Sequence, residues 1–160
     1  MINQEENNQV KTKAPKEIVV YRLGNRWNGS MSAQSVLDAH YFHAKNCSDK
    51  VLFTVETQNV TKIGIGRKPD QIILTLGNFS DGFIANIDDF GEFHSKKPNF
   101  AYQNPSQFDT YKEILTNHTW FALSDPQRIT NSDLAQFKNV NTGKPLTVSL
   151  SGQSCRIYVL

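Results

Sequence analysis

Cysteine is scarce in this chain, and a long apolar run is absent. The 160 residues contain two cysteines, too few for a disulfide framework or a zinc site. No stretch of about 18 consecutive apolar residues occurs, so the sequence predicts no membrane-spanning helix and no membrane partner. Residues 1–17 also lack the apolar segment of a signal peptide. We therefore expect a protein of the reducing cytoplasm.

An excess of charge of one sign is equally lacking. The formal net charge is +2, which excludes a strongly basic protein that coats nucleic acid but leaves room for a local basic patch. With 38% hydrophobic residues, the 160 residues suffice for one sizeable core. Residues 1–16 hold little that can be buried and are predicted to form a disordered arm. This leaves residues 17–160 as a single domain.

The sequence also lacks the motifs of common catalytic sites. No elbow surrounds a serine or cysteine nucleophile. Gly64 and Gly66 lack the third glycine and the following helix of a dinucleotide-binding loop. His40 and His43 are three residues apart, but no carboxylate pair or third ligand completes a metal site. We therefore expect a binding domain rather than an enzyme, with no metal and no cofactor.

Apolar patterning predicts an α+β fold. Nearly continuous apolar residues at 17–23 indicate a strand covered on both faces. The further expected strands are residues 51–55, 62–67, 71–76, 119–124, 145–150 and 156–160, with a short one at 83–87. One helix is expected after Ser30 or Ser32, with an apolar stripe made by Ala33, Val36, Leu37, His40, Tyr41 and Ala44. We predict a small mixed β-barrel of about six strands with this one main helix, a turn at Asp125-Pro126 and a short helical turn at 132–137.

Two tryptophans have different surroundings. Trp27 lies in a polar loop between Arg26, Asn28 and Gly29, which favours a pocket wall over a core position. Trp120 heads an apolar strand and is expected in the core. Stacking of an unpaired base on one aromatic ring contributes about 1–3 kcal/mol, whereas flipping a base out of a duplex costs a few kcal/mol. Trp27 therefore needs aromatic partners if it binds a flipped base.

The segment at 88–110 is a candidate source of those partners. It is long for a loop in a small domain, and such loops are usually functional or disordered. It carries Phe90, Phe93, Phe100, Tyr102 and Phe108, so we expect it to cover part of the domain. Its first three phenylalanines are expected to anchor the loop rather than to contact a ligand.

Several short motifs, taken in order, resemble those of a YTH domain. In the C-terminal third, WFALSDP at 120–126, NSDL at 131–134, NVNTGKP at 139–145 and SGQ at 151–153 resemble the end of that domain. In the first half, VLDA at 36–39, the strand at 51–55 and IGIG at 63–66 follow the family order, and Trp27 lies where the family has its first cage tryptophan. The resemblance implies a PUA-like fold that reads a modified base.

Three departures qualify this resemblance. The family has a helix between its first strand and the cage tryptophan, and the interval from Leu23 to Trp27 is too short for one. This shortening is more similar to prokaryotic EVE domains or to reader domains of modification-dependent restriction systems. The family's second cage tryptophan is missing, and Phe108 and Tyr111 lie nearest its position, with Tyr102 behind them. Leu150 replaces a basic residue of the family.

The resemblance implies specific roles in reading N6-methyladenine or another modified base. Trp27 would stack on the flipped base, the backbone carbonyl of Asn28 would accept from its exocyclic N–H, and Asn59 or Gln58 would bond a ring nitrogen. The residues that remain for the cage are Phe108, Tyr111 and Tyr102. The candidates for contact with the nucleic-acid backbone are Arg22, Arg26, Lys62, Arg67 and Lys68, which Lys96 and Lys97 could join.

Four interpretations stay open. The first is a DNA reader in a restriction or defence system, fused to or associated with a nuclease or NTPase. The second is a reader of N6-methyladenine in RNA. The third is a small ADP-ribosyltransferase-like toxin, since VYRLGNRWNG resembles the arginine-bearing first strand of those proteins, although no glutamate motif follows. The fourth is a protein-interaction module.

Overall fold

The computed structural model describes residues 17–27, 29–55, 69–115, 118–139, 143–149 and 156–159. The predicted disordered arm at 1–16 and the predicted strand at 62–67 lie outside these residues. The strands are β1 (Glu17–Leu23), β2 (Lys50–Val55), β3 (Gln71–Leu76), β4 (Gly82–Glu92), β5 (Thr119–Ile129), β6 (Lys138–Asn139) and β7 (Arg156–Val159). The helices are α2 (Ala33–Asn46), the 3-10 helix η1 (Ser106–Tyr111), α4 (Lys112–Leu115), α5 (Asn131–Gln136) and α6 (Leu146–Ser149).

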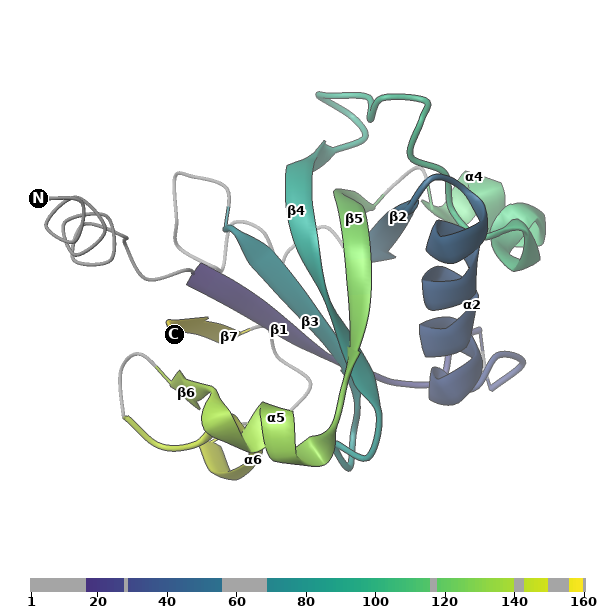
Figure 1. Cartoon of the computed structure of the whole chain (residues 1–160). Helices are drawn as coiled ribbons and strands as arrows, with labels where there is room; N and C mark the ends of the chain where they lie inside the picture. Colours follow the sequence, from purple (N-terminus) through teal and green to yellow (C-terminus); the bar gives the residue numbers. More distant parts are fainter. Residues whose placement is uncertain are drawn as a thin grey trace, which may run out of the picture.

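The strands form one mixed sheet with helices beside both of its faces (Figure 1). Their order is β2-β5-β4-β3-β1-β7-β6; β1 and β3 are parallel, and the other neighbouring pairs are antiparallel. Figure 1 shows α2 beside β2 and β5, and α5 and α6 beside β6 and β7. The predicted α+β class is confirmed, and α2 is the one long helix of the described chain.

β1 lies inside the sheet and is covered on both faces, as its apolar run predicts. Val19 and Tyr21 belong to the main core, which includes the buried face of α2. Ile18 and Val20 point to a second cluster, where Leu134 of α5 is buried. The alternation follows from the two-residue period of a strand. β1 thus contributes to both apolar layers. It ends just before the loop between β1 and α2, here named the Trp27 loop.

The apolar stripe of α2 faces the main core, as predicted. Ser32 is the N-cap, and its hydroxyl accepts from the backbone N–H of Ser35 at 3.2 Å. The helix ends at Asn46, and Ser48 and Asp49 both have a φ of 58°, a left-handed backbone that no helix continues. His40 is fully buried, which confirms its assignment to the core.

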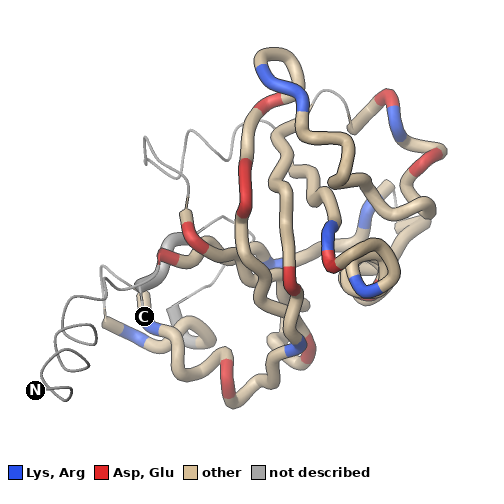
Figure 2. Tube along the Cα trace, turned by 45° about the horizontal axis from the view of Figure 1, so that its top comes forward, with Lys and Arg blue, Asp and Glu red and all other residues tan. Residues whose placement is uncertain are grey.

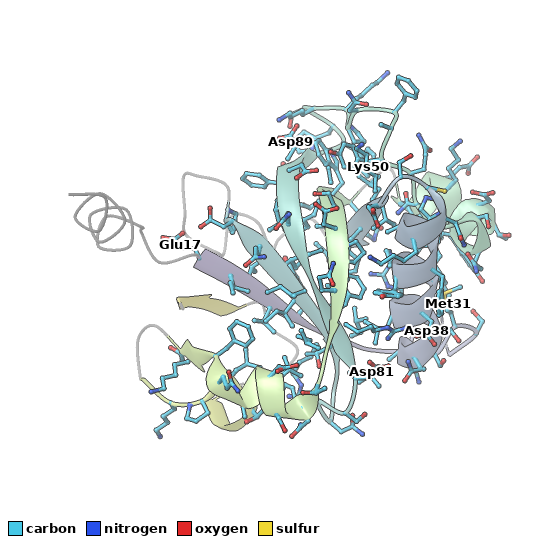
Figure 3. The ribbon with its side chains drawn as sticks, in the orientation of Figure 1. Glu17, Met31, Asp38, Lys50, Asp81 and Asp89 are labelled. Atoms are coloured by element: carbon cyan, nitrogen blue, oxygen red, sulfur yellow. The ribbon has the colours of Figure 1, made fainter. Side chains whose placement is uncertain are left out.

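A guanidinium fixes the start of α2 to the sheet. Arg128 of β5 donates to Asp81 in the β3–β4 turn at 3.0 Å and to Asp38 of α2 at 2.8 Å. Its guanidinium also lies 4.3 Å from the ring centroid of Tyr41. Figure 3 shows Asp38 and Asp81 close together at this end of α2, with Met31 nearby. The Trp27 loop leads directly into this anchored end.

The predicted barrel is wrong for the described residues, where the sheet is open. β2 and β6 are its two edges, and no pairing joins them. Among the described strands, β2 pairs with β5 alone, and the two-residue strand β6 pairs with β7 alone. The strand expected at 62–67 cannot be assigned to either edge because it lies outside the described residues.

Two local predictions are also corrected. β5 continues through Asp125 and Pro126, which had been expected to form a turn. These two residues oppose Ala85 alone, and Asp125 has a φ of 52°, so they form a bulge in which proline interrupts no ladder bond. Residues 146–149 form helix α6 rather than a strand. Pro145 comes directly before α6. Proline suits the start of a helix, because backbone N–H groups there make no hydrogen bond within the helix.

Trp120 is fully buried, as predicted from its apolar strand. Its indole N–H donates to the carbonyl of Lys96 at 2.9 Å. Gly91 on neighbouring β4 leaves room for the ring, because a Cβ at that position would lie 2.9 Å from Trp120 Cζ2. Trp120 thus holds the segment after β4 against the sheet, and Trp27 is the tryptophan left for a site.

Candidate functional site

The site is built on a tight loop between β1 and α2. Arg26 and Met31 form an isolated β-bridge, with N···O distances of 2.8 and 3.2 Å. Inside this bridge, the carbonyl of Trp27 accepts from the backbone N–H of Ser30 at 3.2 Å and from its hydroxyl at 2.9 Å. Trp27 has a φ of 53°, a left-handed conformation that costs of order 1–3 kcal/mol for such a residue. The surrounding hydrogen bonds hold the backbone of Trp27 in this strained conformation, which sets the direction of the indole.

Two predicted partners of Trp27 lie against it. The Tyr111 ring is stacked on the indole, with centroids 3.6 Å apart and an angle of 3° between the planes. The Phe108 ring meets the indole edge-on at 5.0 Å and 85°. Both come from η1, and the Tyr111 hydroxyl lies 3.3 Å from the Ser30 hydroxyl. The structure therefore brings Trp27 together with Phe108 and Tyr111, which lie far from it in the sequence.

The Trp27 and Tyr111 rings are in direct contact. A centroid distance of 3.6 Å is the spacing of two stacked rings, and a base between them would need about twice that distance. Tyr111 thus covers one face of the indole. A base would reach Trp27 either from another side or after Tyr111 has moved.

Arg26 lies among the rings of this site. Its guanidinium carbon is 5.9, 5.6 and 5.5 Å from the ring centroids of Trp27, Phe53 and Phe108 respectively. Its Nη2 also donates to the carbonyl of Thr54 at 2.8 Å, in a part-buried bond. A cation over aromatic faces is stabilised by their quadrupoles. Its predicted contact with a nucleic-acid backbone stays a prediction.

His40 lies beneath the aromatic cluster. Its ring meets those of Phe53 and Phe108 edge-on, at 5.3 and 5.1 Å. Its Nδ1 donates to the Val36 carbonyl at 2.7 Å, while Nε2 has no partner among the described residues. Burial lowers the pKa of His40 to about 3, against the opposing effect of the Val36 hydrogen bond, and the charge of Arg26 lowers it further. His40 is therefore neutral at physiological pH.

Beside Trp27 lies a hollow of about 350 Å³, here named the Trp27 hollow. Its lining residues are Asn25, Arg26, Trp27, Val55, Ile114, Leu115 and His118. The volume falls within the range of pockets that hold small ligands, about 300–1,000 Å³. Ile114, Leu115 and His118 were not predicted as site residues. These three residues belong to α4 and to the segment just before β5, short segments that no periodic pattern indicates.

The remaining predicted site residues divide into two groups. Asn28, Gln58, Asn59, Lys62, Arg67 and Lys68 lie outside the described residues. Arg22 donates to the carbonyl of Gly77, and its guanidinium lies 5.0 Å from the Phe79 ring centroid. Tyr102 packs against the Trp120 cluster, away from Trp27, and donates to Asp88 at 2.5 Å. Its pKa is raised to about 12 by partial burial and by the Asp88 carboxylate.

Over the described residues, charge is distributed without a dominant basic face. Figure 2 shows acidic and basic segments interspersed along the trace. Lys96, which was suggested to contact the nucleic-acid backbone, forms an ion pair with Asp89 at 2.7 Å. Within the described residues, no group of three or more His, Cys, Asp or Glu side chains could hold a metal ion. No helix in the described part of the chain is long and apolar enough to cross a membrane.

Comparison with known proteins gives no relative on which to base an identity. No family model, no curated protein and no solved structure matches this chain. The candidate site therefore rests on its own geometry.

Proposed function

We propose that this protein binds nucleic acid by accepting an unpaired or flipped base, with N6-methyladenine as the first candidate, into the Trp27 hollow. The observation that carries the proposal is an indole fixed by Tyr111 and Phe108 at the edge of a hollow of about 350 Å³. A PUA-like fold of the YTH or EVE type belongs to the same proposal. So does an association with a nuclease or NTPase.

The composition of the Trp27 hollow suits a methylated base. Val55, Ile114 and Leu115 supply apolar surface for a methyl group. Asn25, Arg26 and His118 supply polar atoms at the same hollow for the edge of a base. One methyl group in an apolar pocket contributes about 1–3 kcal/mol, or roughly 10- to 200-fold in affinity. We therefore propose modest discrimination between methylated and unmethylated adenine.

Tyr111 supports the indole in this proposal. It occupies one face of Trp27 and is absent from the lining of the Trp27 hollow. A base in the hollow would then contact Trp27 while Tyr111 and Phe108 keep the indole in place. Preorganisation of this kind reduces the ordering cost of binding.

Replacing Trp27 by alanine is expected to weaken binding of a methylated single strand by roughly 5- to 150-fold, because one stacking contact of about 1–3 kcal/mol is lost. The measurement is a titration of fluorescently labelled DNA and RNA, each with and without N6-methyladenine, at two salt concentrations. The fold is expected to persist because Trp27 is only partly buried, in a loop at the edge of the main core, and circular dichroism checks this. Equal binding by Trp27→Ala and the wild-type protein would contradict the proposal.

A Tyr111 variant separates the two positions for the base. If the base binds in the Trp27 hollow, Tyr111→Ala is expected to weaken binding less than Trp27→Ala does, because Tyr111 only supports the indole. If the base inserts between the rings, both variants lose the same affinity. Tyr111→Phe serves as the matched control, since it keeps the stacked ring and removes only the hydroxyl near Ser30.

A further inference from the structure

A second hollow, of about 400 Å³, lies between the loop at 93–104, the edge strand β2 and helix α4. We name it the Phe100 hollow; Leu52, Phe93, Lys97, Phe100, Tyr102 and Lys112 are among its lining residues. Phe100 is 86% exposed, although the loop aromatics had been expected to serve as anchors. A large aromatic ring left in water at the rim of a hollow offers a stacking surface.

Hydrogen bonds tie down the backbone of the loop that carries Phe100. The Asn99 side chain accepts from the N–H of Ala101 at 2.9 Å, and the Gln103 side chain donates to the carbonyl of Phe100 at 2.6 Å. Leu52 of β2 donates its N–H to the carbonyl of Gln103 at 2.9 Å. Figure 1 shows this segment arching from the end of β4 towards α4. The backbone that carries the exposed ring is therefore preorganised, which favours binding.

Two lysines, Lys97 and Lys112, line the Phe100 hollow. Neither Lys97 nor Lys112 forms an ion pair with any described residue, whereas the adjacent Lys96 pairs with Asp89 at 2.7 Å. Unpaired ammonium groups beside an exposed aromatic ring match a ligand that combines a flat apolar ring with negative charge. An unpaired nucleotide has this combination, because its base stacks and its phosphate attracts lysine.

The Phe100 hollow and the Trp27 hollow meet at α4. Leu115 lines both hollows. Lys112 lies on the same short helix, less than one turn before Leu115. A strand whose modified base enters the Trp27 hollow would therefore pass over α4 to reach the Phe100 hollow. This continuity favours one nucleic-acid strand over two unrelated ligands.

We propose that the Phe100 hollow binds an unpaired nucleotide next to the modified base in the same strand, with its base on Phe100 and a phosphate at Lys97 and Lys112. The inference rests on the proposed function, because it needs the neighbouring base to occupy the Trp27 hollow. Stacking on Phe100 tolerates every base type. The Phe100 hollow would thus add affinity and fix the direction of the strand, and methyl discrimination would come from the Trp27 hollow.

The test compares wild-type protein and Phe100→Ala on a short single-stranded DNA with one central N6-methyladenine. Two further strands each replace one neighbour of that base by an abasic nucleotide. We expect Phe100→Ala to bind the intact strand roughly 5- to 150-fold more weakly than wild type. On one of the two abasic strands, both proteins are expected to bind equally, because the stacking base is absent. Phe42→Ala is the matched control, since Phe42 is 54% exposed on α2 and does not line this hollow.

Lys112→Gln gives an independent readout. Loss of one phosphate contact is expected to weaken methylated and unmethylated strands equally and to reduce the slope of log affinity against log salt by about 0.7. A methyl-dependent loss would overturn the phosphate assignment.

The outcomes distinguish this inference from the proposed function. If Phe100→Ala binds the intact strand as tightly as wild type while Trp27→Ala binds poorly, the inference is wrong and the proposed function stands. The inference is also wrong if Phe100→Ala weakens the intact strand and both abasic strands to the same degree. If Trp27→Ala binds like wild type, or wild type binds no strand, both are wrong.

Discussion

A Phe108→Ala variant is expected to be less stable than the wild-type protein by about 3–5 kcal/mol, the usual cost of removing a fully buried phenylalanine. Phe108 has no exposed surface, and its ring meets those of Trp27 and His40 edge-on at 5.0 and 5.1 Å. Truncation would leave a cavity between the core and the site. Urea unfolding followed by circular dichroism measures the loss in the free energy of unfolding.

The same substitution is expected to weaken base binding in the molecules that remain folded, because the indole of Trp27 loses its edge-on support. Phe100→Ala is the matched control for stability, since the exposed ring of Phe100 should change the free energy of unfolding by less than about 0.5 kcal/mol. A loss below about 1 kcal/mol in Phe108→Ala would show that η1 is not part of the cooperative core.

Mild acid is expected to destabilise the protein through His40. The pKa of His40 is lowered to about 3 in the folded state, whereas an unfolded histidine has a pKa near 6.5. Below pH 6.5 the unfolded state therefore binds more protons, so the free energy of unfolding falls as the pH falls. The slope reaches about 1.4 kcal/mol per pH unit, which amounts to about 2–3 kcal/mol between pH 6.5 and 4.5. The full contribution is present above pH 6.5 and is lost as the pH falls towards 3.

His40→Gln is the control for this acid dependence, because glutamine can still donate to the Val36 carbonyl but does not titrate. Urea unfolding at pH 7.0, 5.5 and 4.5 should give a steeper pH dependence for the wild-type protein than for the variant. His43, whose pKa is also lowered by burial, is retained in both proteins and cancels in the comparison. Identical slopes would mean that His40 is accessible to protons in the folded state.

Local sequence pattern was sufficient to predict which residues of a single helix or strand are buried. The stripe through Val36, Leu37 and His40 repeats at the helical period, and these residues are buried in α2. The continuous apolar run of β1 likewise predicted burial on both faces. Proline was the main source of local error, because its meaning depends on context: Pro126 lies in a bulge, and Pro145 precedes a helix.

The assembly of the site could not be read from local pattern. Ser30 and Tyr111 are 81 residues apart, and only the path of the chain brings them together. The candidates Phe108 and Tyr111 came from a family resemblance, and that resemblance also suggested Tyr102, which packs elsewhere. Phe100 shows a second limit of the sequence. An aromatic residue in a polar loop can be buried as an anchor or left exposed, and the neighbouring residues do not distinguish the two.

The position of β1 also bears on how fast the chain can fold. β1 is the first described strand, yet its neighbours in the sheet are β3 and β7, and Glu17 pairs with Val159. Pairing of such distant residues requires closure of a long loop before any contact compensates for the lost entropy, which slows folding. During synthesis, the apolar run of β1 emerges from the ribosome long before the strand that covers its second edge. Until then that edge is free to bind a chaperone or another nascent chain.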